Sequence, residues 1–174
     1  MKIYATEYDS PVGLLTIAGN GEGIKGLWIR GQKYDRSGLK EAPEEGSSIP
    51  VLQSAKDWLD AYFAGERPEV SSLPLSPEGS AFRRLVWALL CEISYGELTT
   101  YGCLAARAAE KMGREHMSAQ AVGGAVAHNP ISIIIPCHRV VGADGSLTGY
   151  AGGIEKKSFL LRHEGAVLPA LSAP

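Results

Sequence analysis

The sequence predicts a protein of the α+β class, with a β-rich first part and a mainly helical second part. Three short apolar segments separated by turn-forming residues occupy about the first thirty positions, and a segment with helical apolar spacing follows them. From residue 80 onward the apolar spacing is mainly helical. A chain of 174 residues with 45% hydrophobic residues can bury a core as one domain or as two small ones.

The first part is expected to form a meander of strands covered by one helix. The strands are predicted over residues 2–8, 14–18 and 24–30, because Gly, Pro and Asn residues favour turns between them. Residues 51–63 carry apolar side chains at every third or fourth position, which predicts an amphipathic helix that ends at Gly65. Together these elements make a small α+β unit.

A segment rich in proline and serine separates the two parts. Pro68, Pro74 and Pro77, together with three serines, propagate neither a helix nor a strand. We therefore predict an N-terminal domain with its linker over residues 1–78 and a C-terminal domain over residues 79–174.

Three helices are predicted at the start of the second part. Ser80 is a candidate N-cap for the first, Thr99 or Thr100 for the second, and Ser118 for a third helix over residues 119–127. Two short helices across a tight break, the second rich in small residues, resemble a helix-turn-helix, whose second helix approaches DNA.

Two glycines inside the third predicted helix favour a contact there. Gly123 and Gly124 each cost on the order of 1 kcal/mol relative to alanine in a helix. A close approach by another backbone or by a ligand would offset that cost.

The segment 135–140, Ile-Pro-Cys-His-Arg-Val, places a thiol beside an imidazole at the end of an apolar run that is predicted to be a strand. Pro136 fixes its own φ, so the cysteine is expected where the strand ends and the chain turns. A thiol reacts as its thiolate, and His138 and Arg139 are candidates to favour that form. The alternative is a buried structural Cys137 followed by a surface His-Arg pair.

Composition sets limits on location and partners. No apolar run approaches the roughly 18 residues of a membrane span, and the first residues lack a signal-peptide pattern, so we expect no membrane association and an intracellular, cytoplasmic protein, nuclear if the source is eukaryotic. The three cysteines have no CxxC spacing, and neither Cys nor His precedes Cys91, so we expect no metal. The net charge is −2, with 9 Lys/Arg against 7 Asp/Glu after residue 78, which is a weak indication of a polyanionic partner.

Across nearly the whole chain the sequence resembles the O6-alkylguanine-DNA alkyltransferases, which take an alkyl group from damaged guanine onto their own cysteine. The likeness is strongest over residues 80–165. The segments that carry it, in the order of the family, are Tyr95-Gly96-Glu97, Thr100-Tyr101-Gly102, Ala121-Val122-Gly123-Gly124, Asn129-Pro130, residues 135–141, Gly149-Tyr150 and His163-Glu164-Gly165. The resemblance implies a ribonuclease-H-like fold for the first domain and an active-site cysteine in the second.

The same resemblance implies catalytic roles. Cys137 would accept the alkyl group, His138 would act as the base through a water molecule, and Glu164 would hold that histidine oriented and charged. Asn129 would brace the turn before Cys137, and Tyr101 would donate its hydroxyl to a flipped guanine. Taken singly, Tyr101 could be half-buried packing, Asn129 could be turn chemistry, and Glu164 could be a solvated helix end.

The resemblance also implies a DNA-contacting surface and shows one departure from the family. The residues expected to contact substrate or DNA are Gln120, Ala121, Gly123, Ala127, Arg139, Val140, Tyr150 and Ala151. Gln120 stands where the family usually has an arginine that fills the space of the flipped nucleotide, so we expect extrusion weaker by ~1–3 kcal/mol. Ala127 stands where another basic residue is common. Arg114, in the connection before the third helix, is a candidate to compensate.

The function predicted is single-turnover repair of O6-alkylguanine, and of O4-alkylthymine as a second substrate, in double-stranded DNA by a monomer without a cofactor. Two alternatives stay open at this point. One is an alkylated-DNA damage-binding protein of the same fold, in which the Gln120 change has disabled transfer. The other is a Cys-His hydrolase, for which the sequence offers no oxyanion-hole motif.

Overall fold

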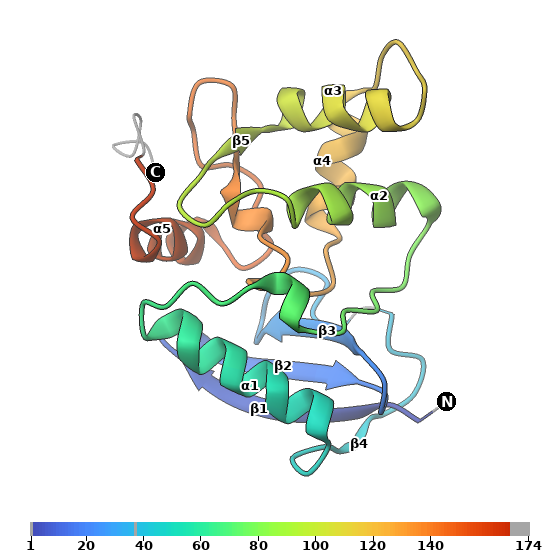
Figure 1. Ribbon diagram of the computed structural model, residues 1–174, viewed down its shortest axis with the longest axis vertical. Coiled ribbons are helices and arrows are strands. Elements are labelled where there is room, and N and C mark those ends of the chain that lie inside the picture. The colour runs from blue at the N-terminus through green and yellow to red at the C-terminus, as the bar shows by residue number, and fades with distance from the viewer. Residues whose placement is uncertain (1, 37, 168–174) are drawn as a thin grey trace. The chain divides into compact units, whose positions relative to one another are not determined.

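The computed structural model describes residues 2–36 and 38–167, which divide into two compact units (Figure 1). The first unit extends to Glu78 and also includes residues 130–134. The second contains residues 79–129 and 135–167. The segment 130–134 therefore packs with the first unit, although it lies within the range 79–174 predicted for the second domain.

The first unit is a four-stranded sheet with one helix packed against it. Strands β1 (Tyr4–Ser10), β2 (Gly13–Gly19) and β3 (Ile24–Ile29) pair antiparallel, and the sheet order is β3-β2-β1-β4. Helix α1 (Pro50–Phe63) buries the side chains spaced at three and four residues along one face, from Leu52 to Tyr62. The three predicted strands and the covering helix are confirmed.

Strand β4 (Glu44–Glu45) was not predicted. It pairs parallel with β1 over only two residues, and both of its side chains are exposed. A polar pair of residues in a Gly- and Glu-rich segment carries no alternation of apolar and polar side chains, so periodicity could not reveal it. A short 3-10 turn, η1 (Val70–Ser72), follows α1.

The apolar run before Cys137 is not a strand, so that prediction is wrong. Only Ile131 forms a bridge, to Leu27 of β3, where the Leu27 N–H donates to the Pro130 carbonyl at 2.8 Å and the Ser132 N–H donates to the Leu27 carbonyl at 2.9 Å. Ile133 has φ of 71°, a left-handed conformation that is rare for a β-branched residue and costs about 1–3 kcal/mol. The isoleucines are buried although they lie in a turn, so their sequence has the same continuous apolar pattern as a buried strand.

The second unit is mainly helical. It contains α2 (Ala81–Leu90), α3 (Tyr101–Lys111), α4 (Ala119–Ala127) and α5 (Ile154–His163), with a 3-10 turn, η2 (Cys137–Arg139), and a short parallel pair of β5 (Thr99–Thr100) with β6 (Val140–Val141). The predicted α+β class is confirmed. No helix in the described ranges is long and apolar enough to cross a membrane.

Three of these helices begin where the sequence predicts. The side-chain oxygens of Ser80, Thr100 and Ser118 each accept a backbone N–H of the first helical turn, at 3.1–3.2 Å. Helices α2, α3 and α4 pack together, and the Trp87 Nε1–H of α2 donates to the Ala125 carbonyl of α4 at 2.8 Å. Helix α4 is thus fixed from its inner side, while its outer side remains exposed.

Candidate active site

Cys137 is buried at the first position of the 3-10 turn η2, with 6% of its surface exposed. Its backbone N–H donates to the Ile135 carbonyl, and the Asn129 Nδ2–H donates to the same carbonyl at 2.9 Å. The side chain of Asn129 therefore joins the two residues that flank segment 130–134, Asn129 itself and Ile135. Burial raises the pKa of the Cys137 thiol, although a hydrogen bond from Asn129 and the charge of Lys157 oppose the shift. The resting sulfur is thus a thiol, which needs a base to react.

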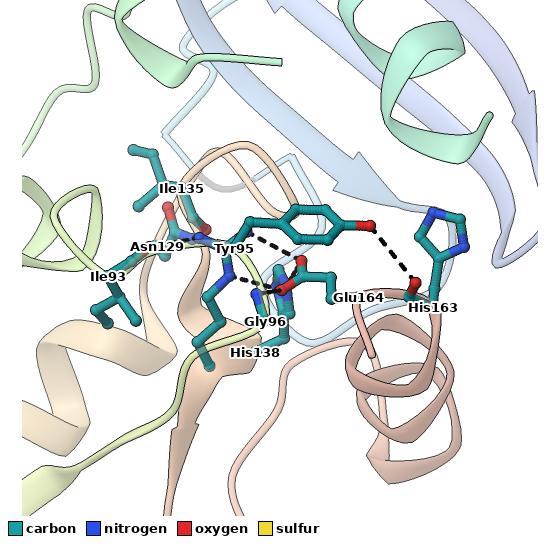
Figure 2. A network of polar contacts seen from close by, with 9 residues as sticks. Ile93, Tyr95, Gly96, Asn129, Ile135, His138, His163 and Glu164 are labelled. Carbon is teal, nitrogen blue, oxygen red and sulfur yellow. Dashed lines mark hydrogen bonds and ion pairs between the residues drawn. The ribbon is translucent and has the colours of Figure 1, made fainter. Parts of the chain in front are cut away.

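His138 follows Cys137 and is completely buried. Its Nε2 lies 2.7 Å from Glu164 Oε2, and its Nδ1 has no hydrogen-bond partner in residues 2–36 and 38–167 (Figure 2). Burial lowers the pKa of His138, and this effect outweighs the opposing hydrogen bond and charge of Glu164. This direction favours a neutral imidazole over the charged one expected from the sequence. Because a carboxylate only accepts, Nε2 carries the proton and Nδ1 is left as an acceptor.

Glu164 is the residue at which the buried polar groups converge. It caps the C-terminus of α5 with 4% of its surface exposed, so the alternative of a solvated helix end is excluded. Its Oε1 accepts from Arg139 Nε at 2.8 Å and from the Gly96 N–H at 3.2 Å, while Oε2 faces His138. Burial favours a raised pKa for Glu164, but hydrogen bonds and charges from His138 and Arg139 outweigh it and hold the pKa well below its usual range.

Arg139 was expected to contact substrate or DNA, whereas the structure places its side chain in a buried ion pair with Glu164. Its side chain is only 7% exposed, and its Nη2 donates to Glu164 Oε2 at 3.0 Å in addition to the Nε bond to Oε1. The guanidinium also donates to the Ile93 carbonyl and lies 5.7 Å from the ring centroid of Tyr95. The guanidinium nitrogens Nε, Nη1 and Nη2 therefore all donate hydrogen bonds to partners within the protein.

The remaining predicted pocket residues lie in the same unit. Tyr101 is half-buried and donates its hydroxyl to the Thr148 carbonyl at 3.0 Å. Tyr150 is 9% exposed, and its hydroxyl has no partner in the part of the chain that the structure describes. Burial raises the pKa of both tyrosines, and the nearby Cys137 adds to the shift. Val140 is buried, and Ala151 is half-buried.

Sequence reasoning missed Lys157. This lysine of α5 is fully buried, and its Nζ donates to the Val140 carbonyl at 2.5 Å and to the Thr148 carbonyl at 2.9 Å. Burial lowers its pKa to about 8, while the nearby Cys137 raises it. The available signal was its spacing, since Lys157 lies three and four residues before the buried Leu160 and Leu161 on one helix face.

Replacing Lys157 with methionine is expected to lower the free energy of unfolding by about 1–3 kcal/mol, because the buried Val140 carbonyl loses its donor. Urea denaturation measures the change. The same substitution at half-exposed Lys156, on the same helix, is the matched control and is expected to leave stability nearly unchanged. Equal losses in the two variants would contradict the anchoring role of Lys157.

The four predicted contact residues on α4 are more exposed than this buried network. Gln120 and Ala121 are exposed, and Gly123 and Ala127 are half-exposed. A Cβ added at Gly123 would lie 3.7 Å from the Tyr101 ring, an ordinary contact, and one added at Gly124 would meet no atom of the described residues within 4 Å. Packing within the chain therefore does not explain why these helix positions are glycines.

A buried cysteine next to a histidine that a carboxylate orients is the arrangement of enzymes that use a thiol nucleophile. The chain matches the family model described as the 6-O-methylguanine DNA methyltransferase ribonuclease-like domain over residues 3–77. It matches the DNA binding domain model of the same description over residues 81–166. The chain therefore belongs to the 6-O-methylguanine DNA methyltransferase family.

Individual relatives agree with this assignment. A methylated-DNA–protein-cysteine methyltransferase of Haemophilus influenzae is 45% identical over 93% of this chain and 86% of its own length. One of Methanosarcina acetivorans is 42% identical over 94% of this chain and 99% of its own length. The crystal structure of Mycobacterium tuberculosis OGT in complex with DNA superposes with a TM-score of 0.79, at 42% identity over 93% of each chain. The ribonuclease-like description of the first domain agrees with the fold expected from the sequence.

Proposed function

We propose that the protein repairs O6-alkylguanine in DNA by transferring the alkyl group irreversibly to its own Cys137. The observation that carries this proposal is the buried arrangement of Cys137, His138 and Glu164 in a chain of this family. The relatives named for methyl transfer from DNA to a protein cysteine support the reaction class. We further propose that the protein acts as a monomer in the cytoplasm, or in the nucleus if the source is eukaryotic, with no metal or cofactor.

In the proposed reaction, the thiol proton of Cys137 passes to Nδ1 of His138 through a bridging water, and the thiolate attacks the sp³ carbon of the alkyl group. The new bond is S–C, and the bond that breaks joins this carbon to O6 of guanine. The electron pair of that bond stays on the base, which takes up the proton released by His138 and becomes guanine. His138 thereby returns to its neutral form. The product is a thioether, so each protein molecule reacts once.

The surrounding residues would position the base. Tyr101 donates to the Thr148 carbonyl in the free protein, so its hydroxyl would exchange that partner for the flipped guanine. Val140, Tyr150 and Ala151 would form the walls of the base pocket, with Lys157 holding the Val140 carbonyl in place. Asn129 would brace the turn before Cys137 through its hydrogen bond to the Ile135 carbonyl.

Helix α4 is the proposed DNA-contacting element, as the second helix of a helix-turn-helix with α3. Its outer side carries small residues, and among the described residues the space beside Gly124 is open, which would allow a nucleic-acid backbone to approach closely. Gln120 lies in the first turn of this helix, where it could fill the space of a flipped nucleotide. The cost of flipping, a few kcal/mol, would be offset by these contacts.

Replacing Gln120 with arginine is expected to strengthen binding to O6-methylguanine DNA by ~1–3 kcal/mol, because a guanidinium adds charge and hydrogen bonds at the flipped site. Titration of a lesion-bearing duplex measures this gain, and single-turnover rates show whether transfer follows. The parallel change of Arg114 to alanine tests compensation by the connection between α3 and α4. Faster repair after the first change, with no effect of the second, would show that Arg114 does not compensate for Gln120.

The stoichiometry of repair tests the proposed function. We expect guanine to be restored in an amount equal to the protein added, with no further turnover. Lesion binding without any restored guanine would indicate the damage-binding alternative instead. Continued turnover on an ester substrate would indicate the hydrolase alternative.

A further inference from the structure

The Arg139 guanidinium contacts three residues of the second unit, Glu164, Ile93 and Tyr95. Its Nε and Nη2 reach the two different carboxylate oxygens of Glu164, at 2.8 and 3.0 Å. Its third nitrogen, Nη1, donates to the Ile93 carbonyl, and the Tyr95 ring lies against the guanidinium. The same Glu164 holds the imidazole of His138 at 2.7 Å.

We propose that Arg139 is a positioning residue of the alkyl transfer, whose guanidinium holds Glu164 in a fixed orientation and keeps His138 neutral and ready to accept the thiol proton. The inference rests on the proposed function, because it assigns a role within the same site. Arg139 acts through Glu164 and His138, and has no contact with DNA in this role.

The charges around His138 explain why Arg139 is needed to balance the negative charge of Glu164. Glu164, at the end of α5, is the negative group, and Lys157 of α5 and Arg139 of η2 are the positive groups. Cys137 precedes the histidine, and the segment 91–98 contributes the Tyr95 ring and the Cys91 thiol near Arg139. A buried carboxylate without Arg139 would stabilise an imidazolium, which has no free lone pair. With Arg139, the carboxylate still orients the imidazole, but its charge is balanced.

The geometry also accounts for the choice of arginine over lysine. A planar guanidinium satisfies both carboxylate oxygens and a backbone carbonyl at once, whereas an ammonium is a point charge on a flexible chain. A lysine at position 139 would retain the charge and lose the fixed orientation. The two substitutions therefore separate the effect of charge from the effect of geometry.

The test compares R139Q, R139K and wild type in single-turnover transfer from an O6-methylguanine duplex, over about pH 5 to about pH 9, with NMR titration of the His138 ring. For R139Q we expect the acidic midpoint of the rate and of the ring titration to move upward by about one pH unit or more. For R139K we expect a nearly unchanged midpoint and a rate lower by about 10- to 100-fold. Lesion affinity is expected to stay constant in both. R107Q, at an exposed arginine paired with Glu92, is the control and is expected to match wild type.

Several outcomes would overturn the inference. If R139Q weakened lesion binding and left the pH midpoint unchanged, Arg139 would act on DNA instead. If R139Q failed to fold, R139K would decide, since a wild-type rate in that variant would exclude a positioning role. Absence of transfer by the wild-type protein would refute the proposed function alone, because the His138 titration still measures the influence of Arg139.

Discussion

Replacing Cys137 with serine is expected to abolish alkyl transfer and to leave binding of lesion-bearing DNA intact. A serine hydroxyl is a far weaker nucleophile than a thiolate. The buried His138 would also remove the proton of a hydroxyl far less readily than the proton of a thiol. The substitution is nearly isosteric, and residue 137 is buried in η2, whereas Gln120 and Ala121 of α4 are exposed. Gel-shift titration and a restored-guanine assay measure the two properties separately.

The other two cysteines provide matched controls. Cys103 is exposed on α3, and Cys91 is partly buried at the end of α2, with a pKa that burial raises to about 11. Serine at either position is expected to leave the extent of transfer unchanged. Loss of transfer in one of these variants, with retention in C137S, would assign the acceptor to another cysteine.

Replacing Glu164 with glutamine is expected to have the largest combined effect on rate and stability. His138 would lose the group that orients it, and loss of positioned general-base catalysis slows a reaction by about 10²–10⁴-fold. Arg139 would be left as a buried charge with a neutral partner, and breaking a buried pair in this way costs about 3–5 kcal/mol. Single-turnover kinetics and urea denaturation measure the two losses.

The same variant is expected to change the response of stability to acid. The folded protein lowers the pKa of Glu164 from its ordinary 4.5, so the unfolded chain binds the proton first and the stability from this group is lost as pH falls below about 4.5. The lowered pKa of His138 acts in the same direction below its ordinary 6.5. The free energy of unfolding of the wild type should therefore fall between about pH 6 and about pH 3, and E164Q should show a shallower slope below about pH 5. Identical slopes would contradict a low pKa for Glu164.

Elements with a clear periodic pattern were predictable. The three strands of the meander, the helix α1 and the capped helices α2, α3 and α4 all follow from apolar spacing and from Ser or Thr at the caps. The run 131–135 was misread because continuous apolar residues indicate burial without indicating the backbone conformation. The left-handed φ of Ile133 and the pairing of Ile131 with Leu27 depend on contacts made at long range.

The identities of the site residues could be predicted from the sequence, but the directions of their side chains could be predicted less well. The order of motifs indicated Cys137, His138 and Glu164, and the structure places the last two in contact. Sequence cannot tell whether an arginine faces solvent or a buried carboxylate, so Arg139 was assigned to DNA although it binds Glu164. Lys157 was missed because a lysine in a charged segment is ordinarily exposed, and only its helical register suggested burial.

Peptide mass spectrometry of the protein after reaction with an oligonucleotide that holds one O6-methylguanine tests the central claim most directly. We expect one methyl group on the peptide that contains Cys137, at a yield of up to one per protein molecule, and none in C137S. Two results would contradict alkyl transfer to Cys137. One is an unmodified Cys137 peptide in a sample whose binding to the lesion has been verified. The other is a methyl group on the Cys91 or Cys103 peptide.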